Sequence, residues 1–70
     1  MVDVNRLQGE LVANKVTKSE MARKLGMSGK TFGLRLKQKR FMTDEIDKMV
    51  DILNLNRESA VKIFFAKEVS

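Results

Sequence analysis

Two helix-start signals with a glycine between them constrain this chain more than any other feature. Thr17 and Glu20 form the pattern Thr-x-x-Glu, in which the threonine oxygen caps a helix and the glutamate binds the cap's backbone N–H. Gly26 suits the position just after a helix, where a left-handed backbone is easiest for glycine. Ser28 is a good N-cap for a following helix. The pattern predicts a helix over Lys18–Leu25, a turn of about three residues, and a second helix.

So short a turn forces the two helices to cross steeply, at about 90–120°. Ala22, which lies four residues before the turn glycine, has a small side chain that lets the second helix lie close across the first. Phe32 and Leu36 lie four apart in the second helix, which we expect to end near Lys37, and they form its inner side. A generic corner of two helices could have the same spacing, so the pattern alone leaves the function open.

Three further helices complete the expected fold, a single all-α domain over residues 1–70. The first helix runs from about Val4 to Asn14 with Asp3 as its cap. The fourth runs over Asp44–Leu53 with Thr43 as its cap, and the fifth follows Asn56. The apolar positions expected on inner faces are Val4, Leu7 and Leu11, with Val12 beside them, then Met21, Ala22 and Leu25, then Phe32 and Leu36, and then Ile46, Met49, Val50 and Leu53.

The composition removes several classes of function. The 70 residues include no Cys and no His, so a disulfide, a thiolate metal site and the usual general base are all missing. We therefore expect no catalytic residue, no metal, no cofactor and no small-molecule substrate. No apolar run approaches the roughly 20 residues that a membrane span needs, and no signal peptide is visible. The expectation is a soluble intracellular protein without a membrane partner.

Positive charge is concentrated in one third of the chain. The net charge is +5, but residues 15–40 alone carry nine Lys and Arg against one acid, Glu20, which gives +8. Residues 41–70 carry −2 and residues 1–14 carry −1. A solvated, lysine-rich face and a surface that binds a polyanion both account for this distribution.

A helical wheel, at about 100° per residue, divides the second helix of the pair into two sides. Phe32 and Leu36 define the inner side, which packs on the core. The opposite side carries no acid. The outward residues are Lys30, Gly33, Leu34 and Lys37, with Gly29 and Thr31 at the helix start.

The composition of this outward side suits the major groove of DNA, which is wide enough to admit a helix. Two glycines in one helix are costly, and they make sense where the backbone must approach something closely. Lys30 can donate to guanine O6 and N7, and Leu34 can touch thymine methyl groups. The alternative is that Leu34 packs on a partner or is simply exposed.

Further polar groups around this helix suit phosphate. Lys18 lies at the start of the preceding helix, where free N–H groups and the helix dipole also favour an anion. Ser28 offers a hydroxyl, and Lys39 and Arg40 follow the end of the second helix at the edge of the groove. Each of them is an ordinary surface residue when taken alone, but together they gather on the predicted DNA side.

The chain resembles the helix-turn-helix of phage repressors and Cro proteins along the run TKSEMARKLGMSGKTFGLRLKQKR, with TDEIDKMVDILNL after it. The opening NRLQGELVAN and the ending VKIFF are similar to a Cro-like subgroup of small phage proteins, so the resemblance covers nearly the whole chain. It implies a five-helix domain that binds operator DNA, commonly as a dimer. It also implies a phage or prophage protein in the bacterial cytoplasm, at the nucleoid.

The resemblance also implies which residues contact DNA. In that family the start of the first helix of the pair contacts phosphate, which corresponds to Thr17 and Lys18. Many members have glutamine or asparagine at the base-reading positions, whereas this chain has glycine, lysine and leucine, so the base preference stays open. Many members have Asn-Gly after the second helix, where this chain has Lys37 and Gln38, so the next loop stays open too. The base-reading positions correspond to Ser28, Gly29, Lys30, Thr31, Gly33 and Leu34.

The C-terminal tail carries more apolar groups than one helix face can bury. The last helix could bury Val61, Phe64 and Phe65, and Ile63 and Val69 would then remain unburied. Residues 62–69 could equally pair as a strand. A locally wrapped tail and a dimer contact both explain the excess. The contact expected for a homodimer consists of Ile63, Phe65 and Val69.

The leading hypothesis is a sequence-specific transcriptional regulator of double-stranded DNA. Its dimer would occupy two half-sites about one turn of DNA apart and block polymerase. The alternative is a protein-interaction module on the same fold, such as an antitoxin or a phage assembly factor, although the segregated charge argues against it. A nonspecific binder of RNA or DNA is a third hypothesis, because a fold alone does not fix a function.

Overall fold

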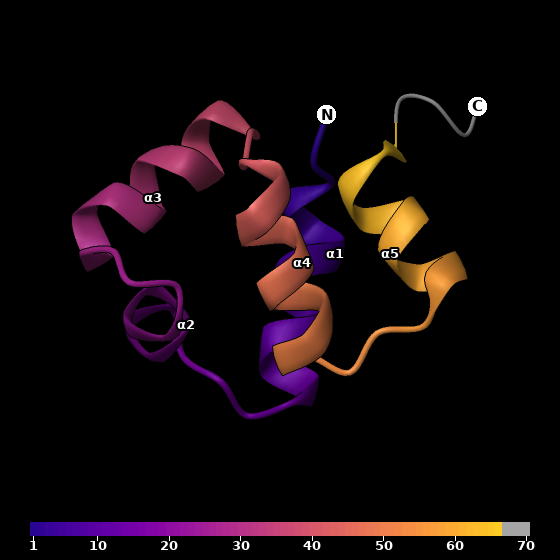
Figure 1. Cartoon of the computed structure of the whole chain (residues 1–70), viewed down its shortest axis with the longest axis horizontal. Helices are drawn as coiled ribbons and strands as arrows, with labels where there is room; N and C mark the ends of the chain where they lie inside the picture. The colour runs from indigo at the N-terminus through magenta and orange to yellow at the C-terminus, as the bar shows by residue number, and fades with distance from the viewer. Residues whose placement is uncertain (67–70) are drawn as a thin grey trace.

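The computed structural model describes residues 1–66, and within them it contains helices and no strand. Short connections join five α-helices, which confirms the all-α prediction for this part of the chain (Figure 1). The alternative of a strand from residue 62 is wrong as far as Phe64, which is helical. No helix among these residues is long and apolar enough to cross a membrane. The helices are α1 (Val4–Ala13), α2 (Lys18–Lys24), α3 (Gly29–Gln38), α4 (Thr43–Ile52) and α5 (Arg57–Phe64).

Four helices begin at the caps that the sequence predicts. Asp3, Thr17, Ser28 and Asn56 each accept a hydrogen bond from the backbone N–H three residues further on, over 2.8–3.1 Å. These side chains satisfy N–H groups that have no partner within the helix. Because such bonds are local, the starts of these helices are legible in the sequence.

The start of α4 is set differently, and its predicted cap is wrong. Thr43 is the first residue of the helix, and the N-cap is Met42, whose side chain makes no cap hydrogen bond. The Glu45 carboxylate accepts from the Met42 backbone N–H at 2.9 Å, and its other oxygen lies 3.1 Å from Arg35 Nη2 on α3. Glu45 is only 8% exposed. A contact with another helix therefore takes part in fixing where α4 begins.

The core contains most of the predicted inner-face residues. Val4, Ile46 and Val50 are partly buried and pack against it. Val12, which was expected beside the inner face of α1, is 78% exposed. Leu7 and Leu11 already fill the inner side of α1, and Val12 lies about 100° away from Leu11 around the helix. The buried residues are Val2, Leu7, Leu11, Met21, Ala22, Leu25, Phe32, Leu36, Met49, Leu53, Ile63 and Phe64.

The face that α5 buries also differs from the prediction. Ile63 is 2% exposed and is a core residue, whereas Val61 and Phe65 lie on the surface. Ala60, Ile63 and Phe64 have the same i, i+3, i+4 spacing as the predicted face, so periodicity could not choose between the two. Ile63 is thus excluded as a dimer contact, Phe65 stays available at 41% exposed, and Val69 lies outside the described residues.

Two backbone hydrogen bonds of the N-terminal segment connect it to the ends of α3 and α5. The Val2 N–H donates to the Lys39 carbonyl at 3.1 Å, and the Asp3 N–H donates to the Ile63 carbonyl at 2.7 Å. The Val2 side chain is itself in the core. The C-terminal end of α3 is therefore held in place by the same segment that leads into α1.

Candidate nucleic-acid interface

The interface is built on α2 and α3, which lie together on one side of the molecule, with α5 on the other side (Figure 1). In that view α2 is seen almost end-on while α3 lies across the picture, so the two helices cross steeply. Four residues, Leu25–Ser28, separate them, one more than predicted. Gly26 has a φ of 76°, a left-handed conformation that glycine adopts without strain. Ala22 is buried, as the close crossing requires.

The two sides of α3 are as different as the helical wheel predicts. Phe32 and Leu36 are buried, and the Phe32 ring lies 5.6 Å from the ring of Phe41, beyond the end of the helix. Leu34 is 49% exposed, and Lys30 is exposed beside it. The inner side therefore fixes α3 on the core, and the residues of its outer side do not pack against the rest of the domain.

The glycines of α3 are not required by the fold. Gly29 and Gly33 are helical, and neither has a positive φ. A Cβ atom added at either position would meet nothing within 4 Å. Since alanine would fit at both places and favour the helix, the packing of this chain gives no reason for glycine there.

The predicted site residues lie in three places: the start of α2, the start and outer side of α3, and the loop after α3. No Asp or Glu occurs between Glu20 and Asp44, so the whole α3 segment is free of acids. Nearly all the predicted residues are at the surface, and only Thr31 is half-buried. The exposed members are Thr17, Lys18, Ser28, Gly29, Lys30, Gly33, Leu34, Lys37, Lys39 and Arg40.

Arg35 is the one basic residue of α3 that belongs to the fold. Its guanidinium pairs with the Glu45 carboxylate, and its side chain is 29% exposed. On the wheel it lies about 60° from Phe32, toward the inner side. That position, together with an acid in the first turn of the next helix, was a signal from which the ion pair could have been predicted. Within residues 1–66, Lys30, Lys37, Lys39 and Arg40 form no ion pair.

The hydroxyl groups at the helix starts are already engaged in caps. Thr17 Oγ1 accepts from the Glu20 N–H, and the Thr17 N–H donates to the Glu20 carboxylate at 3.0 Å. That backbone hydrogen bond is the main reason that the pKa of Glu20 lies below its ordinary value, with Arg23 and Lys24 contributing less. A carboxylate thus sits at the first turn of α2, so an anion there would depend on the Lys18 side chain. Ser28 Oγ accepts from the Thr31 N–H and donates to Thr31 Oγ1.

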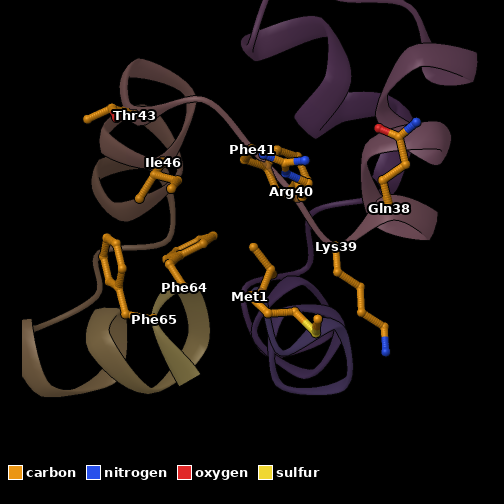
Figure 2. A pocket seen from close by; sticks show the side chains of 10 residues that line it. Met1, Gln38, Lys39, Arg40, Phe41, Thr43, Ile46, Phe64 and Phe65 are labelled. Carbon is orange, nitrogen blue, oxygen red and sulfur yellow. The ribbon is translucent and has the colours of Figure 1, made fainter. Parts of the chain in front are cut away.

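The loop after α3 turns through a left-handed residue, Lys39, whose φ is 58°. The Arg40 N–H donates to the Arg35 carbonyl at 3.2 Å and so closes the end of the helix. The lysine thus takes the place that glycine often occupies at a helix end. Its carbonyl is held by Val2, so the backbone of the loop is fixed while the lysine side chain projects outward (Figure 2).

Beside this loop lies a hollow of about 450 Å³ between the ends of α3 and α5. Figure 2 shows Phe64 and Phe65 pointing toward Ile46 on one side of it, while Lys39 points away on the other. The hollow is therefore apolar toward α5, and Gln38, Lys39 and Arg40 line it toward the end of α3. It contains Phe65, the exposed member of the predicted dimer contact.

The comparisons with known proteins identify a family and no function. A family model matches residues 1–68, and that family is described as "Protein of unknown function (DUF739)". No curated protein and no solved structure gives a significant match to the chain. The geometry of the chain is thus the main evidence for what it does.

Proposed function

The chain belongs to the DUF739 family, whose function is not known, and we propose that it is a sequence-specific, double-stranded-DNA-binding regulator of transcription. The outer side of α3 is the observation that carries this proposal. It is exposed, basic, free of acids and unused by the fold. The resemblance of the run beginning at Thr17 to the helix-turn-helix of phage repressors and Cro proteins supports the same function.

The proposed mode of binding places α3 in the major groove. The groove is about 12 Å wide, which matches the diameter of a helix with its side chains. At Gly29 and Gly33 the helix has no side chain, so its backbone can approach the base edges closely. The fold gains nothing from these glycines, and Gly33, which lies in mid-helix, costs about 0.5–1 kcal/mol relative to alanine. A close approach to a ligand would explain why they are there.

Two kinds of contact follow from the positions of the side chains. Lys30 donates to guanine O6 and N7, and Leu34 contacts thymine methyl groups from the same side of the helix. Lys18, Lys39 and Arg40 lie at the two ends of this surface and bind phosphate, which positions the protein without reading sequence. Arg35 is left out of the interface because Glu45 already pairs with it.

A second copy of the chain completes the proposed regulator. Two copies reading half-sites about one turn of DNA apart would cover a stretch of duplex and exclude polymerase from it. The exposed Phe65 and the hollow beside it are the proposed contact between the copies. This contact replaces the one that included Ile63, which is a core residue.

A selection of duplexes from a random library tests the proposal. The full chain should enrich a defined sequence at fixed salt. Lys30→Ala should lose about 1–3 kcal/mol on that sequence and relax the preference at one position, whereas Lys39→Ala should weaken all sequences alike. Lys48→Ala, which removes an exposed lysine from α4, is the matched control and should change neither.

Two results would contradict the proposal in different ways. Binding without any enriched sequence would leave a nonspecific nucleic-acid binder. An enriched sequence that survives both Lys30→Ala and Leu34→Ala unchanged would show that α3 does not read the bases.

A further inference from the structure

A second hollow lies away from α3, between the end of α1 and the start of α2. Its volume is about 450 Å³. Leu11, Val12 and Val16 supply its apolar surface, and Lys15 and Lys18 supply its charges. Thr17 and Lys18 also belong to the candidate nucleic-acid interface, whereas the other residues that line this hollow have no part in it.

Val12 is the residue of this hollow that the fold does not explain. At 78% it is the most exposed large apolar side chain among residues 1–66. The inner side of α1 is filled by Leu7 and Leu11, so Val12 adds nothing to the core. A β-branched residue also favours a helix less than alanine or lysine would. Neither packing nor helix propensity therefore accounts for a valine at this place.

The charge around Val12 is of one sign. Lys15 and Lys18 form no ion pair within residues 1–66, and no acid lines the hollow. Glu10 lies on another side of α1, where it lines a different hollow with Lys62. The backbone of Lys15 is held at the edge of the hollow, because its N–H, on a left-handed residue (φ 56°), donates to the Val12 carbonyl at 3.0 Å.

We propose that this hollow docks an acidic segment of another protein, anchored by one apolar side chain. The apolar side chain would sit against Val12, and carboxylates on either side of it would pair with Lys15 and Lys18. A central apolar contact surrounded by complementary charges is the arrangement that protein interfaces use for affinity and for specificity. A DNA backbone offers phosphates but no apolar anchor, so it would leave Val12 unused.

Docking at this place has a regulatory consequence, which rests on the proposed function. Lys18 cannot pair with a partner's carboxylate and with a DNA phosphate at the same time. An acidic partner would therefore compete with DNA for the start of α2. The docking itself does not depend on DNA binding and can be tested without it.

The test begins with a random displayed-peptide library selected on the full chain. The selected peptides should combine Asp or Glu with a large apolar residue, and one such peptide, made synthetically, is the probe. Val12→Ser should weaken the probe by about tenfold, which is the loss expected when one aliphatic anchor is removed. Serine and valine have similar helix propensities, so the variant should fold. Lys15→Glu should weaken probe binding more than Val12→Ser does, because it places a carboxylate where the probe's own carboxylate would bind.

Matched controls separate this surface from the others. Val61→Ser, which changes an exposed valine of α5, and Lys48→Glu on α4 should leave probe binding unchanged. Val12→Ser should also leave DNA binding intact.

The proposal is overturned if the selected peptides share no acidic and apolar pattern, or if Val12→Ser leaves the probe's affinity as it was. It is equally overturned if Val12→Ser weakens the binding of DNA as much as the binding of the probe peptide, because the hollow would then be part of the nucleic-acid interface. A failure of the duplex selection alone would refute the proposed function and leave the docking site standing.

Discussion

Gly33 lies in mid-helix on the exposed side of α3, and Gly9 occupies the same kind of position in α1. Neither has a positive φ, and a Cβ at either place would meet nothing within 4 Å. Replacing each by alanine should therefore stabilise the fold by about 0.5–1 kcal/mol, which raises the melting temperature by a few degrees. The difference between the two variants should appear only in function.

Gly33→Ala should weaken binding to the selected duplex, because its methyl group would stand between the α3 backbone and the groove. Gly9→Ala should leave binding unchanged, and it controls for the gain in stability. Calorimetry and a titration of the duplex measure both effects. If Gly33→Ala binds as well as the unaltered chain, the glycine does not serve a close approach to DNA.

At the scale of the helix, the start of α2 depends on the ionised form of Glu20. Hydrogen bonding to Thr17 lowers the pKa of Glu20, so the folded helix favours the carboxylate over the acid. The contribution of the capping box is complete above the ordinary pKa of a glutamate, and it is lost as the pH falls through the lowered value. The Thr17 amide resonance should report this loss in an NMR titration. In Glu20→Gln the cap should remain, because glutamine also accepts from the N-cap N–H, and the acid dependence of that resonance should disappear.

The contact between α3 and α4 depends on one buried carboxylate. Glu45 pairs with Arg35 and accepts from the Met42 N–H. Glu45→Ala should destabilise the domain by about 1–3 kcal/mol, because it leaves a half-buried guanidinium and a backbone N–H without their partner. Urea unfolding measures the loss, and Asp47→Ala, on the exposed side of α4, is the control. A stability equal to that of the control variant would show that the ion pair does not hold α3 in place.

These two helix starts also show what a sequence can and cannot predict. The cap at Thr17 was predictable because its partner lies three residues away and any chain with this pattern can form it. The start of α4 was missed although its cap bond is equally local: the Glu45 carboxylate accepts from the Met42 N–H three residues earlier, but methionine is not a usual N-cap residue, whereas Thr43 is. Likewise, two faces of α5 have equal periodicity, and only the packing of α5 against α1 selects Ile63 over Val61. The outer side of α3 was predictable because one helix and its two inner residues, Phe32 and Leu36, define it.

At the scale of the whole molecule, the proposed function predicts how strongly DNA binding depends on salt, because that dependence reflects the number of cations that contact phosphate. The basic third of the chain carries +8, but the pairing of Arg35 with Glu45 removes one of its cations from the surface available to DNA. If the remaining cations neutralise about four to five phosphates per copy, the logarithm of the binding constant should fall with the logarithm of salt concentration at a slope of about −3.5 to −4.5 per copy.

The salt slope of single-substitution variants should show which cations contact phosphate. Arg40→Ala, at the end of α3, should reduce it by about one unit, because a protein that binds one phosphate fewer also displaces about one counterion fewer from the DNA. Lys48→Ala removes the same charge from the chain but lies on α4, among acids, and it should leave the slope as it was. Equal effects of the two variants would mean that net charge alone governs binding. A slope near zero in the unaltered chain would exclude nucleic acid as the partner of α3.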